Sequence, residues 1–185
     1  MNDFTRVNRS MYLIVVSDTH DNMPVIKKFV DLVNSKYKGE KTIVHLGDMI
    51  SPFAARYLVE NLEDVKRGIF VYGNNDGDKI LLYKILSKAS WEVYHGPAII
   101  ELFGKKVLIM HGFNGPEHTA LIASSLSQSE NVDAVFYGHT HRMDYRVIKG
   151  KIIVNPGEAC GYLTGKSTFM VLDKDTFKPE IVEIQ

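Results

Sequence analysis

The sequence predicts an α/β fold, and two observations support this prediction. Short apolar runs rich in β-branched residues, such as 12–16 and 43–46, alternate with stretches of helical periodicity in the first half of the chain. Such alternation is typical of parallel strands joined by right-handed helical crossovers. Later in the chain, two apolar runs are separated only by Gly104 and Lys105, which predicts a hairpin with antiparallel pairing. We therefore expect a parallel first half and a later part that forms a meander.

Each element of the first half is predicted from its own pattern. Residues 12–16 are apolar without interruption, as expected of a strand that is buried on both faces. Pro24 suits the first turn of a helix, and apolar residues recur at helical spacing as far as Val33. Ser51 and Pro52 are typical of a helix start, with the serine hydroxyl as a cap. The predicted strands are 12–16, 43–46, 69–72 and 91–94, and the helices lie at 24–33, 52–61 and 79–87.

In the second half of the chain, the apolar runs are mostly separated by short turns. The turn signal Asn155-Pro156-Gly157 lies between two of them, because these residue types favour tight turns. The predicted elements are one helix at 116–126 and strands at 98–103, 106–110, 135–137, 145–148, 151–155, 169–173 and 180–184.

Length and charge limit the classes of protein to which the chain can belong. Its 185 residues suit one domain with a substantial core, which we expect to span 11–185. The 22 basic and 22 acidic residues give a formal net charge of zero. The sequence therefore has no basic surface for nonspecific binding of nucleic acid or anionic membranes. Because there is no such surface, any phosphate binding must arise from a local site. No apolar run approaches the length of a membrane span.

The N-terminal residues and the single cysteine indicate a cytoplasmic protein. Residues 1–10 are polar and lack the apolar core of a secretory signal, so we expect a flexible extension there. A strand-like run begins at Met11, which is therefore an alternative start of the chain. Cys160 has no partner for a disulfide within the chain, as is usual in a reducing compartment.

Side chains that can bind a metal follow five separate predicted strands. Binding sites in open α/β sheets lie outside the carboxyl ends of the strands, so we expect these side chains to converge. Oxygen and imidazole donors together favour Mn²⁺, Fe²⁺, Co²⁺, Ni²⁺ or Zn²⁺ over Ca²⁺, which prefers oxygen alone. The candidate metal ligands are Asp18, His20, Asp48, Asn74, His111, His139 and His141.

His139 and His141 are separated by one residue and come directly after the predicted strand 135–137. Side chains alternate along an extended backbone, so both imidazoles are expected to face the same way. The alternative interpretation is that both are polar residues of a surface loop. His45 lies inside a predicted strand, where we expect a hydrogen-bonded core histidine rather than a ligand.

Taken in order, the polar motifs resemble those of the calcineurin-like metallophosphoesterases, in particular the small phosphodiesterase branch of that superfamily. The resemblance covers most of the chain and rests on the ordered set rather than on any single motif. It implies a four-layer αββα sandwich of two mixed sheets flanked by helices. The matching motifs are Asp18-x-His20, Gly47-Asp48, Gly73-Asn74-x-Asp76, His111-Gly112 and Gly138-His139-x-His141.

The resemblance also implies two divalent transition metals per chain, with Mn or Ni as the first choice and Fe, Co or Zn as alternatives. Two such cations, offset by two aspartates, leave a charge of about +2 for a substrate and a hydroxide. A metal-activated hydroxide would then attack phosphorus in line with the leaving group of a small phosphate ester, with diesters preferred. By this resemblance one metal is held by Asp18, His20, Asp48 and His141, and Asp48 bridges it to a second metal held by Asn74, His111 and His139.

The sequence departs from the family's pattern at the expected leaving group. Many larger members have a histidine at the position of Asn75, and an asparagine cannot act as a general acid. Phe113 stands where some members have a further histidine. We therefore expect a preference for good leaving groups, with assistance from Asn75 and Arg142, although the alternative for Arg142 is a solvated side chain. Asp76 is expected either to orient a ligand imidazole or to cap a turn.

Three other functions agree with parts of the pattern. The superfamily includes a retromer subunit of similar size that serves as a protein-interaction scaffold, but scaffold members are expected to have lost ligands. A metallo-β-lactamase-like hydrolase needs Asp-His after its His-x-His, and this chain has Met143 and Asp144 there. An amidohydrolase barrel needs eight βα units, for which 185 residues are too few. The sequence favours the phosphodiesterase over a weakly active or inactive scaffold, and leaves association into homo-oligomers open.

Overall fold

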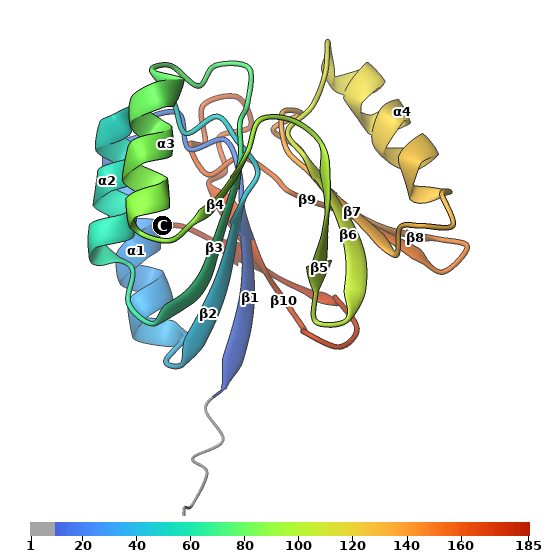
Figure 1. The fold of residues 1–185 in the computed structure, drawn as a ribbon, viewed down its shortest axis with the longest axis horizontal. Helices are drawn as coiled ribbons and strands as arrows, with labels where there is room; N and C mark the ends of the chain where they lie inside the picture. The colour runs from blue at the N-terminus through green and yellow to red at the C-terminus, as the bar shows by residue number, and fades with distance from the viewer. Residues whose placement is uncertain (1–9) are drawn as a thin grey trace, which may run out of the picture.

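Two β-sheets pack face to face, and helices cover the outer face of each sheet (Figure 1). The structure, a computed structural model, describes residues 10–185. The extension predicted for residues 1–10 therefore lies outside the described residues, except for Ser10, and the single domain predicted for 11–185 stays a prediction. The expected αββα sandwich of two mixed sheets is confirmed.

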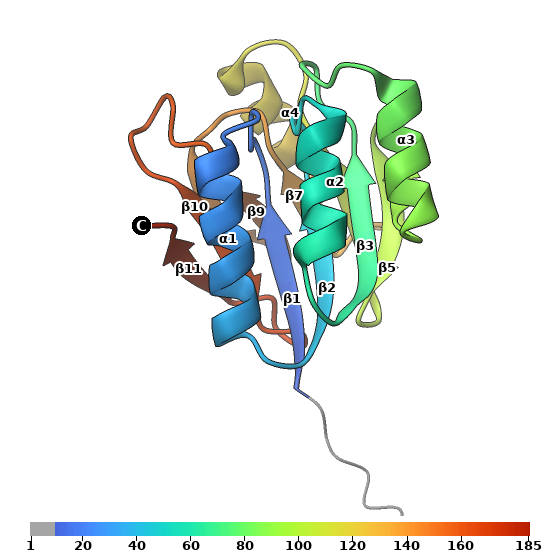
Figure 2. The same cartoon turned by 90° about the vertical axis from the view of Figure 1, so that its left-hand side faces the viewer.

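The first sheet contains, in spatial order, β11 (Pro179–Glu183), β10 (Thr168–Leu172), β1 (Met11–Val16), β2 (Glu40–His45), β3 (Val65–Val71) and β4 (Glu92–Tyr94). Strands β1 to β4 are parallel to one another, whereas β10 runs antiparallel to both of its neighbours. The outer face is covered by three helices, α1 (Met23–Lys36), α2 (Pro52–Asn61) and α3 (Lys79–Lys88), which lie side by side (Figure 2). The predicted alternation of strands and helices in the first half is therefore confirmed.

The second sheet contains, in spatial order, β5 (Ala98–Leu102), β6 (Lys105–Met110), β7 (Ala134–Tyr137), β9 (Lys151–Pro156) and β8 (Met143–Ile148). Strands β6, β7 and β9 are parallel, and helix α4 (Pro116–Ser127) forms the crossover between β6 and β7. Only β5 and β8 are antiparallel edge strands. The predicted meander is therefore wrong for much of the later chain, and the hairpin β10–β11 returns to the first sheet. Apolar runs reveal strands, but they do not reveal the direction of pairing.

The hairpin between β5 and β6 turns one residue earlier than predicted. Leu102 pairs with Lys105, so the two turn residues are Phe103 and Gly104. Their φ angles of 49° and 75° are both left-handed, as the favoured two-residue hairpin turn requires. Glycine accepts this conformation without strain, and Lys105 belongs to the strand.

The strands are apolar on both faces because each sheet is buried on both faces. In β1, Leu13 and Val15 pack into the core between the sheets, together with Phe136 of β7. Ile14 and Val16 of the same strand pack against the helices that cover the first sheet. A third cluster fills the space between α4 and the second sheet. This packing fixes the two sheets so that the carboxyl ends of β1, β2, β3, β6 and β7 meet along one edge.

Within residues 10–185, no helix is both long and apolar enough to cross a membrane.

Candidate metal centre

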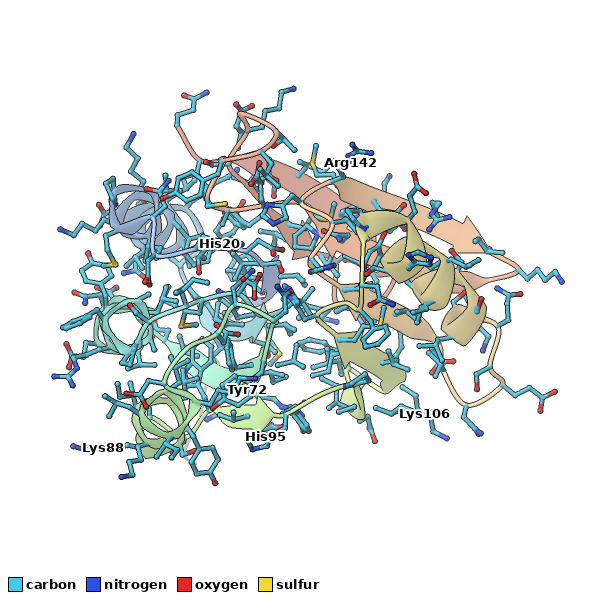
Figure 3. The ribbon with its side chains drawn as sticks, turned by 90° about the horizontal axis from the view of Figure 1, so that it is seen from above. His20, Tyr72, Lys88, His95, Lys106 and Arg142 are labelled. Carbon is cyan, nitrogen blue, oxygen red and sulfur yellow. The ribbon has the colours of Figure 1, made fainter. Side chains whose placement is uncertain are left out.

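All seven candidate ligands lie in the loops that follow five strands, at the edge seen from above in Figure 3, where His20 is labelled. Asp18 and His20 follow β1, and Asp48 and Asn74 follow β2 and β3. The second sheet contributes His111 after β6, and His139 and His141 after β7. These side chains therefore lie close together, as the sequence predicted. Their atoms form two groups.

The first donor group consists of Asp18, His20, His141 and Asp48. Asp18 Oδ1 lies 3.5 Å from His141 Nε2 and 3.7 Å from His20 Nε2. His20 Nε2 lies 3.4 Å from Asp48 Oδ2. The rings of His20 and His141 are neighbours, with centroids 5.1 Å apart.

The second donor group consists of Asp48, His111, Asn74 and His139. His111 Nε2 lies 3.3 Å from Asp48 Oδ2, 3.1 Å from Asn74 Oδ1 and 3.3 Å from His139 Nδ1. One atom, Asp48 Oδ2, is thus close to both groups. The two groups contain the residues that the resemblance assigned to two metals.

Both groups have the properties of a cation site. Asp18 Oδ1 and His20 Nε2 are buried, and neither has a hydrogen-bond partner among the described residues. Ligands about 2.1 Å from one ion lie about 3.0 to 3.4 Å apart in octahedral or tetrahedral arrangements. Most separations within the groups, from 3.1 to 3.5 Å, are close to this range. The donor set therefore fits divalent cations, which would satisfy the two unpaired atoms.

The backbone around these residues differs from the prediction. Asp18, Asp48, His139 and His141 have φ angles of 53°, 54°, 68° and 60°. The expected alternation of His139 and His141 along extended backbone is therefore wrong. Asp and His enter the left-handed region more readily than most residues, and in this conformation the two imidazoles diverge. His139 faces His111, whereas His141 faces Asp18.

Glycines next to the ligands permit this close packing of loops. A Cβ on Gly73 would lie 2.1 Å from Asp48 Oδ1, and one on Gly138 would lie 2.1 Å from Ser17 Oγ. Both distances are far inside van der Waals contact, so a side chain at either position would push two of the strand ends apart.

The carboxylates and imidazoles shift one another's protonation. Burial acts to raise the pKa of Asp48, but hydrogen bonds from His111 and Asn75 hold it well below its ordinary value. The carboxylate of Asp18 raises the pKa of His20, although burial opposes the shift. Burial acts to lower the pKa of His111, but Asp48 and Asp18 raise it overall. Without a cation, His20 and His111 therefore hold protons more readily than free histidines do, and a bound cation would replace them.

Asn75 and Asp76 contact Asp48 in different ways. The backbone N–H and side-chain amide of Asn75 donate to the two carboxylate oxygens of Asp48, each at 2.8 Å. Asp76 accepts from the backbone N–H groups of Asp48, Ile50 and Gly73 at 3.1, 2.8 and 2.6 Å. Of the two roles expected for Asp76, the structure contains the turn cap, through the Gly73 N–H, and not the contact with an imidazole; Asp76 also binds the backbone of the loop after β2. Among the bonds it makes is one to Ile50, whose φ of 81° is strained for a β-branched residue.

Ser51 differs from the prediction, and Arg142 lies apart from the centre. The Ser51 hydroxyl does not cap α2 as predicted. It donates to Asp21 Oδ1 at 2.7 Å, which links the loops after β1 and β2. Arg142 is exposed and lies at the outer edge of the molecule, away from His20 (Figure 3). It borders a hollow of about 280 Å³ between α4 and β8.

The sequence did not single out Glu158, which is fully buried beside the first donor group. Its Oε2 accepts a hydrogen bond from His141 Nδ1 at 2.7 Å. Burial acts to raise the pKa of Glu158, but hydrogen bonds from His141 and Thr164 lower it to about 2. Cys160 lies close by, with its Sγ 3.1 Å from Glu158 Oε2, and burial raises its pKa to about 12. Glu158 directly follows the turn signal Asn155-Pro156-Gly157, whose first two residues belong to β9. Glu158 reaches His141 because β9 is parallel to β7, which the sequence did not predict.

His45 is the buried core histidine that its place in a strand predicted. Its Nδ1 accepts from the Gly47 N–H, and its Nε2 lies 3.2 Å from Thr19 Oγ1. Burial lowers its pKa to about 3. Below about pH 6.5, His45 therefore takes up a proton in the unfolded chain but stays neutral in the folded chain.

His45 should consequently destabilise the metal-free protein as the pH falls from 6.5 towards 3. We expect a loss of about 1.4 kcal/mol of unfolding free energy per pH unit from this residue. Urea denaturation at pH 6.5 and 5.0 measures it, with His45→Asn as the reference that cannot titrate. The advantage of the wild type over the variant should shrink on acidification, and parallel pH profiles would contradict the assignment.

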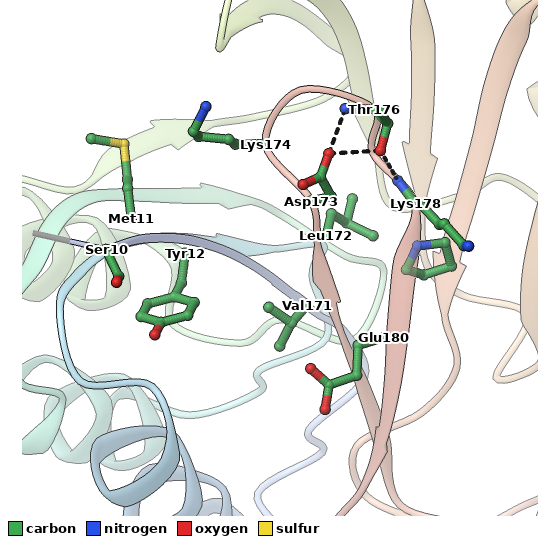
Figure 4. A pocket seen from close by; sticks show the side chains of 11 residues that line it. Ser10, Met11, Tyr12, Val171, Leu172, Asp173, Lys174, Thr176, Lys178 and Glu180 are labelled. Atoms are coloured by element: carbon green, nitrogen blue, oxygen red, sulfur yellow. Dashed lines mark hydrogen bonds between the residues drawn. The ribbon is translucent and has the colours of Figure 1, made fainter. Parts of the chain in front are cut away.

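A larger hollow of about 770 Å³ lies at the opposite end of the first sheet (Figure 4). It is bordered by the start of β1 and by the β10–β11 hairpin, including Tyr12, Lys174 and Glu180. Asp173 and Thr176 close the hairpin turn through hydrogen bonds of 2.6 and 2.7 Å. This hollow contains none of the candidate ligands.

The chain is similar to known phosphoesterases in both sequence and fold. The sequence pattern of the calcineurin-like phosphoesterase superfamily domain matches residues 11–176. The chain is 34% identical over 176 residues to phosphodiesterase MJ0936 of Methanocaldococcus jannaschii, covering 94% of this chain and 98% of that protein. The solved structure of an archaeal phosphodiesterase superposes with a TM-score of 0.80 at 30% identity, covering 94% and 99% of the two chains.

Two more distant structures share the fold alone. Zinc-bound Vps29 of Entamoeba histolytica has a TM-score of 0.61 at 20% identity, covering 95% of this chain and 100% of that chain. The phosphoesterase YfcE of E. coli has a TM-score of 0.63 at 19% identity, with the same coverage.

Proposed function

Because the chain belongs to the calcineurin-like phosphoesterase superfamily, we propose that it is a metal-dependent phosphodiesterase with two divalent cations per chain. The observation that carries this proposal is the position of Asp48 Oδ2, which lies within 3.4 Å of donors in both groups. A carboxylate oxygen in this position is suited to bridge two cations. The similarity to phosphodiesterase MJ0936 supports a diester as the substrate.

The first donor group would hold one cation and the second donor group the other, with Mn or Ni as the first choice and Fe, Co or Zn as alternatives. The mixture of carboxylate, amide and imidazole donors suits such metals. When bound, the cations would supply the positive charge that acidifies a water molecule and offsets charge on the phosphoryl oxygens. Asp18 and Asp48 leave about +2 of that charge for an anionic substrate.

The residues around Asp48 determine which esters can react. Asn75 holds the Asp48 carboxylate through two hydrogen bonds, and its amide has no proton to give to a leaving group. We therefore infer that a leaving group departs without a general acid at this position, which favours diesters with acidic leaving groups. Arg142 lies apart from the donor groups, so we assign to it contact with the distal part of a diester rather than with the phosphorus centre.

A protein-interaction scaffold, the alternative weighed from the sequence, is the second candidate function, because the fold by itself does not establish an activity. Every position of both donor groups is occupied by a side chain that can bind a metal, which favours the enzyme.

We also place the protein in the cytoplasm, because its only cysteine, Cys160, is buried and cannot form a disulfide within the chain.

The proposal predicts that protein loaded with Mn²⁺ or Ni²⁺ hydrolyses bis-p-nitrophenyl phosphate, and does so faster than p-nitrophenyl phosphate. Elemental analysis of the same sample should give two metals per chain. Both nitrophenolate leaving groups are acidic, so no protein acid is needed. A sample that hydrolyses neither ester and binds fewer than two metals would favour the scaffold.

A further inference from the structure

We propose that Glu158 is a positioning residue that fixes the proton of His141 on Nδ1, so that His141 Nε2 is free to bind a cation in the first donor group. The inference rests on the proposed function, since it assigns Nε2 a role towards a cation. It concerns a side chain that belongs to neither donor group and contacts the first one through His141.

The geometry of His141 gives its two nitrogens different tasks. Nδ1 lies 2.7 Å from Glu158 Oε2, whereas Nε2 lies 3.5 Å from Asp18 Oδ1 in the first donor group. A carboxylate can only accept a hydrogen bond, so a neutral imidazole must place its single proton on Nδ1 to bond with it. The lone pair of Nε2 then points towards the donor group. A buried carboxylate behind a histidine is a frequent device for orienting metal ligands.

The carboxylate itself is held rigidly by the loop that follows. Glu158 Oε2 also accepts from Cys160 Sγ and from the Tyr162 N–H, both at 3.1 Å. Oε1 faces the other way and accepts from the Leu163 N–H at 2.9 Å and from the Thr164 hydroxyl at 2.7 Å. The Glu158 carbonyl accepts from the Thr168 N–H of β10 at 2.9 Å. Glu158 therefore joins the first donor group to the rim loop, defined as residues 161–165.

The division between the two oxygens makes Glu158→Gln a selective test. A glutamine can keep its carbonyl oxygen at the position of Oε1, where the Leu163 N–H and the Thr164 hydroxyl donate, although it gives up the Tyr162 N–H bond to Oε2. Its NH₂ group then replaces Oε2 and faces His141 Nδ1, which must now accept. The proton of His141 would move to Nε2, and that nitrogen could no longer bind a cation.

Two measurements follow from this reversal. In metal-free Glu158→Gln protein, ¹⁵N NMR of labelled histidine should show the proton of His141 on Nε2 instead of Nδ1. Calorimetric titration with Mn²⁺ should show affinity at one of two sites reduced about 10- to 100-fold, with the other site unchanged. The unchanged site also reports that the variant is folded.

Thr164→Val is the matched control, because it removes a hydroxyl from Oε1 and leaves the contact between Glu158 and His141. Its affinities should stay within about twofold of wild type, and its His141 proton should stay on Nδ1. If Thr164→Val behaves like Glu158→Gln, the rim loop rather than the imidazole contact controls the site, and the inference is wrong. The inference is equally wrong if wild-type protein binds two cations and Glu158→Gln binds both with unchanged affinity. If wild-type protein does not bind two cations, the proposed function itself fails.

Discussion

Asp48→Ala should reduce hydrolysis of bis-p-nitrophenyl phosphate by about a thousandfold or more in metal-loaded protein. Asp48 Oδ2 is the atom close to both donor groups, at 3.4 Å from His20 Nε2 and 3.3 Å from His111 Nε2. Its removal deprives both groups of the donor and the single negative charge that they share. Losses of this size are typical when a residue that acts as part of a catalytic unit is removed. Initial rates and metal content should be measured on the same samples.

The fold should survive this substitution. The Asp48 carboxylate accepts from Asn75, which is exposed and can bond to water instead, and from His111, which keeps its contacts with the Leu46 carbonyl and Asn74. Circular dichroism should therefore match the wild type, and Asp175→Ala, which removes an exposed carboxylate from the β10–β11 turn, should keep full activity. An Asp48→Ala protein that retains more than a tenth of wild-type activity would show that the two donor groups do not act through Asp48.

The sequence could predict the candidate ligands because they share one simple relation to the fold. Each follows an apolar run that is buried on both faces, so each lies where a strand leaves the sheet. The helix predicted between β6 and β7 returns the chain so that these two strands are parallel, and their carboxyl ends lie at the same edge as those of β1, β2 and β3. The wrong prediction of a meander therefore did not affect the predicted ligands.

What the sequence could not predict depends on loop geometry and on long-range pairing. The left-handed backbone at His139 and His141 separates their imidazoles, and no periodic pattern encodes that. Ser51 has the residue type of a helix cap, but Asp21 from another loop takes its hydroxyl. Glu158 reaches His141 only because β9 lies parallel to β7, with its end at the same edge. These relations arise when distant segments are brought together.

Removal of the cations should abolish the hydrolysis of bis-p-nitrophenyl phosphate and also destabilise the fold. A ligand present at about a thousand times its dissociation constant adds about 4 kcal/mol to the unfolding free energy per site. We therefore expect the melting temperature to fall on treatment with a chelator and to recover when Mn²⁺ or Ni²⁺ is added back. In the first donor group, a cation would also give a partner to Asp18 Oδ1 and His20 Nε2, buried atoms that have no hydrogen-bond partner within residues 10–185.

The size of this effect should depend on pH, because protons and cations compete for the same imidazoles. In metal-free protein the pKa values of His20 and His111 are raised by Asp18 and Asp48. The stability they contribute is fully present below about pH 6.5 and is lost as the pH rises through the raised pKa values. Cation binding displaces these protons and is favoured over the same pH rise. The difference in melting temperature between loaded and chelated protein should therefore widen from pH 6 to pH 8, and a constant difference would mean that these imidazoles do not bind the cations.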